Sequence, residues 1–509
     1  MSFIRVFRFY ASRNAHCSYT NKTLVGAHNL QYRIISRRNS FLFRSFSQVT
    51  MHPLDDSSVE NFSIPGAQVF DRYFECPLDY DNDKSPKLKI FVRHLVPIEK
   101  ASLMKKMPFF LYLQGGPGFE CALPSSGTSG WIKVAFEKGF QVLLLDQRGT
   151  GFSSQISSES LDKLFKSDEE KAEYLTHFRA DNIVRDCEHI RKLLTAERSA
   201  EEESRITLLG QSFGGFCITT YLSLFPESIR HAYITGGVPP LVNNPDQVYR
   251  ALYPRIAKKN KLYYQKFPRD MARVRQIVEH LTQNKVGLPN GGYLSVRRFL
   301  QLGLSFGGSG GYDAVHGIVQ SAAEDLDRLG QLSYRTLNAV QTTQSWDTNV
   351  IYAVLHEAIY CQANQSSRWS AERLLKEEPF ASQFEHRLDC LSKDQVMYFT
   401  GETIYPFMFD DYAELRPLKQ VAHLLAEKRW GALYDTNALN QLKGPQVAGV
   451  SYFDDMYVDR ELSEQTASEI KGFQQWITNE YAHNGLRVDG ERILNYLMRL
   501  ARGDESFNR

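Results

Sequence analysis

A serine enclosed by glycines carries the clearest chemical signal in this chain. Residues 206–216 read ITLLGQSFGGF, so an apolar segment runs directly into Gly210-x-Ser212-x-Gly214. Glycines are used where the backbone turns tightly or where another segment must come close. A serine on such a strand-to-helix turn has its hydroxyl exposed for nucleophilic attack. The bare pentapeptide also occurs by chance in glycine-bearing loops, so its surroundings must decide.

A nucleophilic serine needs a general base, and the late histidines are the candidates. In hydrolases whose nucleophilic serine lies on such a strand-to-helix turn, the catalytic residues follow one another along the chain in the order Ser, acid, His. His423 and His483 both follow the middle of a long helical region. His423 lies in LRPLKQVAHLLAEK, an amphipathic helical stretch, and is most simply a packing residue. His483 lies in the loop NEYAHNGLR between the last strand and the last helix, which makes it the candidate base.

The acid that orients the base is expected at the end of the preceding strand. There SYFDDMYVD offers Asp454 and Asp455. Side chains alternate between the two faces of a strand, so only one of these carboxylates can reach His483. The other is then a structural residue.

The oxyanion donors are expected from two places. One is the N–H of Phe213, directly after the nucleophile, and the other is the QGGPG turn at 114–118, through Gly115 and Gly116. On its own this sequence would indicate only a tight turn. Joined to the glycine-enclosed serine and the late Asp and His, it predicts a serine hydrolase.

The elements that must position these residues predict a parallel sheet. Residues 68–97 read as a hairpin, and short apolar runs at 108–113, 139–145, 206–211 and 231–235 alternate with amphipathic helices such as 178–194, with Asp181 as a possible N-cap. Continuous apolar runs of this kind indicate a sheet covered on both faces. Open α/β sheets bind ligands at the carboxyl ends of their strands, where glycines and polar residues stand in this sequence.

The domain organisation follows from where the strand signal stops and resumes. Residues 241–430 are polar, aromatic and helical in pattern, whereas strand-like runs return at 446–455 and 472–481. We therefore predict a core of residues 51–240 and 431–509, with 241–430 inserted as a helical cap. A second, independent domain is the alternative.

Composition adds a targeting hypothesis and excludes some functions. The first 50 residues hold eight Lys or Arg, seven Ser and no Asp or Glu, within a chain of net charge +2. This is typical of a mitochondrial presequence, although a tail preceding a start at Met51 is the alternative. The rest of the chain is mildly acidic and therefore has no large positive electrostatic field that would attract nucleic acid. Seven scattered cysteines indicate reduced thiols in an intracellular compartment, and no apolar run is long enough to span a membrane.

Eight stretches together resemble one peptidase family. LQGGPGFE, GFQVLLLDQRGTGFSS, FRADNIVRD, LLGQSFGGFC, HEAIYCQ, FTGETIYPFMF, YFDDMYVD and NEYAHNGLR are similar to segments of the proline iminopeptidases, or prolyl aminopeptidases. The resemblance spans about residues 60–500. It implies an α/β-hydrolase fold with an inserted helical cap over the active site.

The resemblance also implies roles for individual residues. Ser212 would be the nucleophile, Asp455 the acid and His483 the base, and proline would leave small peptides through an acyl-enzyme on Ser212. Cap glutamates would hold the free amine, with Glu357 of HEAIYCQ the better match and Glu402 of TGETIYP the weaker one. No metal or organic cofactor is implied.

Physical reasoning agrees with an aminopeptidase, because a buried substrate cation must be paired with a carboxylate. A pocket for proline would be apolar and aromatic, and its candidates are Phe119, Phe213, Tyr405 and Phe407. Two other functions stay open. A lipase or esterase on the same scaffold would lack the carboxylate clamp, and a catalytically inactive hydrolase fold would serve as a binding scaffold.

Overall fold

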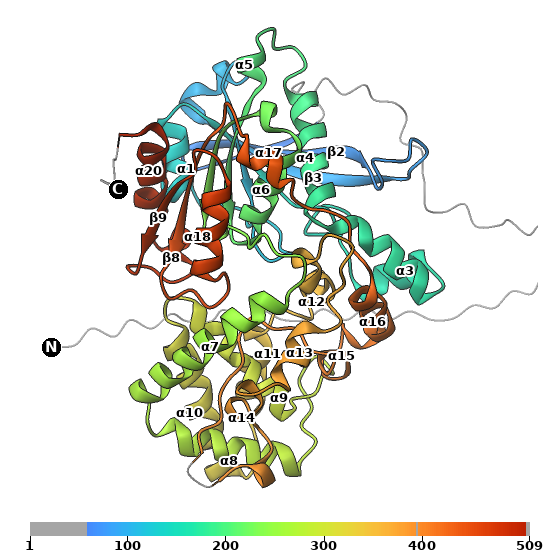
Figure 1. Ribbon diagram of the computed structural model, residues 1–509, viewed down its shortest axis with the longest axis vertical. Coiled ribbons are helices and arrows are strands. Elements are labelled where there is room, and N and C mark those ends of the chain that lie inside the picture. The colour runs from blue at the N-terminus through green and yellow to red at the C-terminus, as the bar shows by residue number, and fades with distance from the viewer. Residues whose placement is uncertain (1–58, 393–394, 505–509) are drawn as a thin grey trace, which may run out of the picture. The chain divides into compact units, whose positions relative to one another are not determined.

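A nine-stranded sheet forms the centre of the computed structural model, which describes residues 59–392 and 395–504 (Figure 1). The strands lie in the order β1-β2-β3-β5-β4-β6-β7-β8-β9. The first three are antiparallel, β3 meets β5 antiparallel, and all later neighbours are parallel. Their bounds are β1 Glu60–Ile64, β2 Ala67–Pro77, β3 Lys87–Pro97, β4 Phe109–Leu113, β5 Gln141–Leu145, β6 Ile206–Gln211, β7 Ile229–Thr235, β8 Gln446–Tyr452 and β9 Gln474–Thr478.

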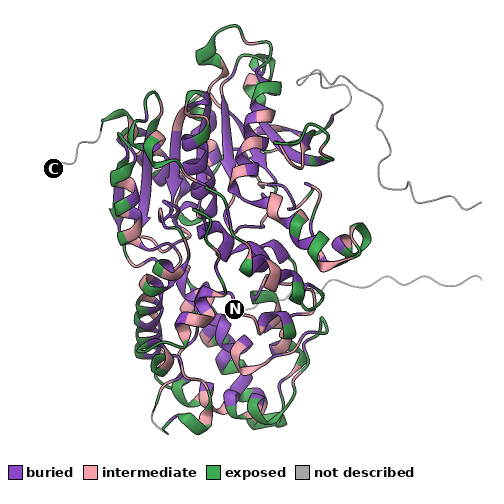
Figure 2. Cartoon of the chain, turned by 45° about the vertical axis from the view of Figure 1, so that its right-hand side comes forward, coloured by how far each residue is buried: buried purple, intermediate pink, exposed green. Residues whose placement is uncertain are grey.

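Both faces of the central parallel strands β4, β5 and β6 are buried, which explains their largely apolar sequences. In β4, Phe109, Leu111 and Leu113 join one hydrophobic cluster, whereas Phe110 and Tyr112 join a second cluster on the opposite face. All five residues are buried, and Figure 2 shows the central strands of the sheet in the colour of buried residues. A strand with period-2 alternation and two covered faces must be apolar at every position.

Helices cover the two faces in separate groups. The cluster on one face includes residues of α4 (Ala180–Leu194) and α6 (Phe213–Leu224), whereas the other includes residues of α1 (Gly130–Glu137) and α20 (Gly490–Arg502). The mostly parallel sheet with helices on both faces agrees with the predicted fold class. Further helices of the core are α2 (Ser158–Leu164), α3 (Asp168–Leu175), α5 (Glu201–Ser204), α18 (Arg460–Glu469) and α19 (Gly485–Val488).

The chain between β7 and β8 is helical where the structure describes it. β8 nevertheless pairs directly with β7, so this segment is inserted between two neighbouring strands. Most of its helices lie beneath the sheet in Figure 1, whereas the last of them, α17, lies beside α6. Its helices are α7 (Asp246–Lys266), α8 (Asp270–Gln283), α9 (Val296–Leu300), α10 (Gly311–Leu329), α11 (Tyr334–Thr343), α12 (Val350–Leu355), α13 (Ser370–Leu375), α14 (Phe380–Gln383), α15 (Met408–Asp411), α16 (Lys419–Glu427) and α17 (Thr436–Asn440). The exact boundaries 241 and 430 stay predictions.

Some local expectations need correction or fall outside the described residues. The N-cap of α4 is Arg179 rather than Asp181, which lies inside the first turn. Strand β1 was not predicted, because its sequence ENFSI is short and mixed. The predicted presequence, residues 1–50, lies outside the described ranges. Within those ranges the structure contains no helix with the length and apolar character needed to cross a membrane.

Candidate active site

Ser212 stands at the turn between β6 and α6, in a strained backbone conformation. Its φ is 54° and its ψ is −123°, a region that a residue with a side chain rarely adopts. Such a conformation costs on the order of 1–3 kcal/mol, so the surroundings must enforce it. The Ser212 N–H donates to the Thr235 carbonyl of β7 at 2.9 Å, and its own carbonyl accepts from Gly215 N at 2.7 Å.

The glycines of the motif are required by close contact between segments. A Cβ atom at Gly214 would lie 2.0 Å from the carbonyl oxygen of Leu113 in β4. At Gly210 it would lie 2.5 Å from the Gly214 backbone. Only glycine lets the strand and the helix approach this closely, and their approach turns the serine away from the sheet.

Asp455 and His483 form a buried, hydrogen-bonded pair. His483 Nδ1 lies 2.7 Å from Asp455 Oδ2, although the two residues come from loops after different strands. The other carboxylate oxygen, Oδ1, accepts the N–H groups of Tyr457 at 2.8 Å and Val458 at 3.2 Å. An acceptor fixed at Nδ1 keeps the proton on that nitrogen and leaves Nε2 free to act as a base.

The electrostatics of His483 follow from the same pair. Burial by itself would lower the pKa of this imidazole, but the Asp455 charge and hydrogen bond outweigh it and raise the pKa above its usual value. The ring also meets the edge of Tyr457, with centroids 4.7 Å apart.

The histidine loop is tied to the nucleophile turn by the residue that precedes the serine. Gln211 Nε2 donates to the His483 carbonyl at 3.1 Å. A Cβ atom at Gly236, which follows β7, would lie 3.3 Å from His483 Nδ1. Three segments that are distant in the sequence therefore meet at the carboxyl ends of β6, β7 and β8.

The alternative aspartate and histidine lie elsewhere. Asp454 faces outward and pairs with Lys258 at 2.6 Å, where both side chains are about half exposed (40% and 54%). His423 in α16 accepts a hydrogen bond from Trp369 Nε1 at 3.1 Å. The structure thus brings Asp455, not Asp454, to His483.

The QGGPG turn passes directly beside Ser212. A Cβ atom at Gly115 would lie 2.9 Å from Ser212 Cβ and 3.5 Å from its Oγ. Gln147 Nε2 donates to the carbonyl of Gln114 at 2.9 Å and holds the start of the turn. Phe213 begins α6, and the first N–H groups of a helix have no partner within it. Gly115 and Phe213, two of the residues predicted to supply oxyanion donors, therefore lie beside Ser212.

Glu402 is a buried carboxylate whose charge interacts with the Asp455–His483 pair. Tyr352 Oη donates a hydrogen bond to its Oε1. Burial raises the pKa of Glu402 to about 7, while the Tyr352 bond and the charge of His483 pull it down and the charge of Asp455 pushes it up. The charges of Glu402, His483 and Asp455 therefore influence one another.

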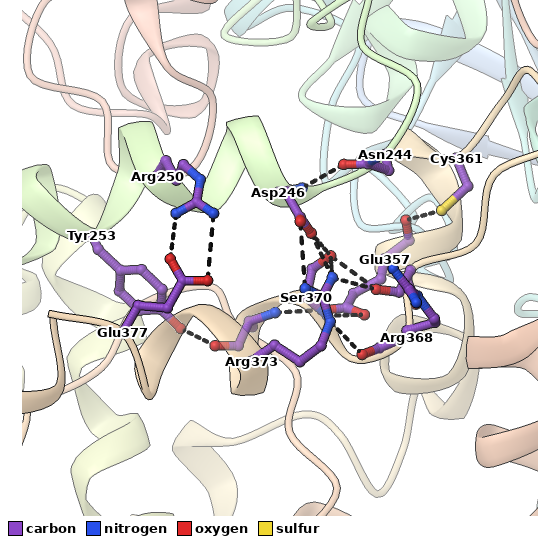
Figure 3. Close-up of polar contacts among 12 residues, drawn as sticks. Asn244, Asp246, Arg250, Tyr253, Glu357, Cys361, Arg368, Ser370, Arg373 and Glu377 are labelled. Carbon is purple, nitrogen blue, oxygen red and sulfur yellow. Dashed lines mark hydrogen bonds and ion pairs between the residues drawn. The ribbon is translucent and has the colours of Figure 1, made fainter.

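Glu357 is equally buried but has a different environment. It lies beside the start of α13 (Figure 3), where its oxygens accept the backbone N–H groups of Ala371 at 2.9 Å and Ser370 at 3.2 Å. Burial raises its pKa to about 7, and these N–H donors oppose the rise. A carboxylate at a helix N-terminus is a favourable arrangement in its own right.

The charges of both glutamates influence the buried phenol of Tyr249 in α7. Burial, then the charges of Glu357 and Glu402, raise the pKa of this phenol well above its usual value. Within the described part of the chain Tyr249 Oη has no hydrogen-bond partner. A buried hydroxyl that is influenced by the charges of two buried carboxylates marks a polar region inside the cap, and unpaired buried groups of this kind require an explanation.

The predicted pocket aromatics separate into two groups. Phe119 follows the QGGPG turn and meets the ring of Tyr352 edge-on, and Phe213 packs against Phe216. Tyr405 and Phe407 stack on one another, and the Arg297 guanidinium lies over both rings. Of the four, Phe119 is the residue that joins the QGGPG turn (114–118) to Tyr352, whose hydroxyl donates to Glu402; we call 114–119 the oxyanion turn after its predicted role.

Comparison with known proteins identifies the family. A family model described as the alpha/beta hydrolase fold matches residues 108–345. A proline iminopeptidase of Aeromonas sobria is 44% identical over 449 residues, covering 88% of this chain and 99% of the relative. The chain belongs to the proline iminopeptidase family. A proline iminopeptidase of Aspergillus aculeatus is 38% identical over 429 residues, covering 84% of this chain and 92% of the relative.

The family membership and the α/β-hydrolase fold predicted from the sequence are thereby confirmed. Among solved structures, a proline iminopeptidase of Mycobacterium smegmatis is 12% identical with a TM-score of 0.34, and the match covers 85% of this chain and 100% of that structure. Nothing further rests on that likeness.

One buried ion pair of this chain was not predicted from its sequence. Arg148, in the turn after β5, donates to both oxygens of Asp186 in α4 at 2.6 and 2.8 Å. The same guanidinium reaches the carbonyls of Pro77, Leu78 and His177. The signal was present in the stretches DQRGTG and FRADNIVRD, because charges within apolar surroundings must be paired.

Across residues 59–392 and 395–504, no three His, Cys, Asp or Glu side chains cluster in a way that could hold a metal ion.

Proposed function

We propose that this chain is a prolyl aminopeptidase that removes N-terminal proline from small peptides through an acyl-enzyme on Ser212. The observation that carries the proposal is the Asp455–His483 hydrogen bond beside the strained Ser212 turn, in a chain 44% identical to a proline iminopeptidase. This combination supplies a base, an oriented acid and a nucleophile on one edge of the sheet.

In the first half of the reaction, Ser212 Oγ attacks the carbonyl carbon of the N-terminal proline while His483 Nε2 takes the hydroxyl proton. The negative oxygen of the tetrahedral intermediate is stabilised by N–H groups of Phe213 and of the Gly115–Gly116 turn. The intermediate collapses with cleavage of the C–N bond, and His483 returns the proton to the departing amine. In the second half, water attacks the prolyl ester by the same route and free proline leaves.

The free amine requires a carboxylate, and two candidates are present in the cap. Glu402 ranks first, because its charge interacts with those of His483 and Asp455. Glu357 ranks second, because both of its oxygens already accept N–H groups of α13. This order reverses the one that the family resemblance implied. A carboxylate with several lone pairs can still accept a further donor, so both remain in the proposal.

The substrate panel that tests the proposal compares free and N-acetylated aminoacyl naphthylamides. Prolyl 2-naphthylamide with a free amine should be hydrolysed, and its N-acetylated form should be a far poorer substrate. Preference for N-blocked or uncharged esters would instead favour an esterase. Failure of a fluorophosphonate probe to label Ser212, with no turnover of either substrate class, would favour a binding scaffold.

A further inference from the structure

Tyr352, a residue that the sequence did not single out, is directly bonded to the proposed amine-binding carboxylate. It lies in α12, is almost fully buried, and its hydroxyl donates to Glu402 Oε1. A hydroxyl that donates to a carboxylate stabilises the ionised form of that carboxylate. The contact therefore bears on both the orientation and the charge of Glu402.

The ring of Tyr352 is held between two other aromatic rings. Trp346 stacks against it with centroids 4.3 Å apart and an interplanar angle of 19°. Phe119 meets it edge-on, with centroids 5.0 Å apart and an angle of 70°. Rings packed in this way leave the hydroxyl little freedom to move, which is how a positioned side chain is kept in place.

The backbone near Tyr352 is fastened to the oxyanion turn. Asn349 Nδ2 donates to the carbonyl of Gly118 at 2.9 Å. A Cβ atom at Gly118 would lie 2.9 Å from Tyr352 N, so the two segments are in direct contact. Gly118 and Phe119 belong to the same turn as Gly115, whose backbone lies over Ser212. A continuous set of contacts therefore runs from the oxyanion turn to Glu402.

We propose that Tyr352 is a positioning residue that fixes the Glu402 carboxylate at a set separation from the oxyanion turn. In an aminopeptidase the amine and the scissile carbonyl belong to the same residue, so this separation determines which bond is cut. A displacement of about 1 Å in such a site can lower the rate by roughly 10²-fold. The inference rests on the proposed function, because it requires Glu402 to hold the substrate amine.

The charged groups around Glu402 define what a change at Tyr352 would do. Burial raises the pKa of Glu402, the Tyr352 bond and His483 lower it, and Asp455 raises it. Three further phenols lie within range of its charge: Tyr249, Tyr360 and Tyr457. Removing only the Tyr352 hydroxyl leaves all of these in place, so the pKa of Glu402 should rise.

The test is the pH profile of kcat/KM for Tyr352→Phe on two substrates. For prolyl 2-naphthylamide, the acid limb should move upward by about one pH unit, with a roughly tenfold loss below the limb and recovery above it. Nitrophenyl acetate has no amine, so the acid limb of its pH profile should depend on the ionisation of His483 and should not move. In a Glu402→Gln background the Tyr352→Phe change should add little, because the carboxylate it acts on is gone.

Tyr360→Phe is the matched control, since Tyr360 also feels the charge of Glu402 while the hydrogen bond comes from Tyr352. Its acid limb should match that of the wild type. An equal loss on both substrates in Tyr352→Phe, without a shift of the limb, would overturn the inference, as would the same shift in Tyr360→Phe. A wild-type enzyme that cleaves the ester but not the prolyl substrate would instead refute the proposed function.

Discussion

Replacing Asp455 with asparagine should disable the base without removing it. Asp455 Oδ1 accepts two backbone N–H groups and Oδ2 accepts the His483 Nδ1 proton at 2.7 Å. The asparagine carbonyl would keep the two backbone donors, which turns the amide NH₂ toward Nδ1. A donor there forces the imidazole proton onto Nε2, so the ring can no longer take the Ser212 proton. We expect kcat to fall about 10⁴-fold, the magnitude found when a triad histidine is held in the wrong tautomer.

The adjacent residue supplies the control. Asp454→Asn removes a half-exposed pair with Lys258, and such a pair contributes about 0–1 kcal/mol to stability. Its kcat on prolyl 2-naphthylamide should stay within a few-fold of the wild type. Both variants should be compared at equal folded concentration, judged by their circular dichroism. A loss in Asp454→Asn as large as in Asp455→Asn would refute the assignment of the acid.

The remaining predictions concern the clamp, the stability of the site and the N-terminus. Glu402→Gln should lower kcat/KM for prolyl 2-naphthylamide roughly 30-fold or more, since truncating one partner of a buried charge pair costs about 2–5 kcal/mol. Hydrolysis of nitrophenyl acetate should stay nearly unchanged. Glu357→Gln should lower kcat/KM for the prolyl substrate by a smaller factor, and the reverse order of the two variants would contradict our ranking. The pKa of Glu402 in the folded protein is raised from 4.5 to about 7, so its ionisation destabilises the fold as the pH rises through that range. Above pH 7 the free energy of unfolding of Glu402→Gln, measured by chemical denaturation, should therefore exceed that of the wild type by up to about 3 kcal/mol. Below about pH 4 the two free energies should be equal. Asp186→Asn should lower the free energy of unfolding by about 3–5 kcal/mol by leaving Arg148 unpaired; a smaller change in urea denaturation would show that the pair is dispensable. N-terminal sequencing of the protein from its own cells should begin near residue 40–55 if residues 1–50 are a presequence, and an intact Met1 would contradict that prediction.

The sheet could be predicted from the sequence because the hydrophobic pattern of each strand is contained in a short segment of the chain. Each parallel strand is a run of apolar residues, and both faces of β4 are in fact buried. The hairpin predicted at 68–97 corresponds to β2 and β3, whose register pairs Ala67 with Pro97. The N-cap at Asp181 was wrong because Arg179 already adopts the extended backbone from which the helix begins.

The site was harder to read because it depends on distances between segments that the sequence does not fix. Strand alternation left Asp454 and Asp455 equivalent, and only the folded loop turns one of them toward His483. Glu357 was predicted as the main amine-binding residue from its motif, whereas in the folded chain its two oxygens accept backbone N–H groups of α13. Tyr352 had no signal at all, since a tyrosine in an apolar helix is ordinarily a core residue.

Trapping the covalent intermediate tests the central claim most directly. The wild-type protein and Ser212→Ala should each be mixed with prolyl nitrophenyl ester, quenched in acid within the first turnover and measured by intact-protein mass spectrometry. We expect the wild type to gain the mass of one prolyl group, located on the peptide that contains Ser212, and Ser212→Ala to gain none. Turnover without any adduct, or an equal adduct on Ser212→Ala, would contradict an acyl-enzyme on this serine.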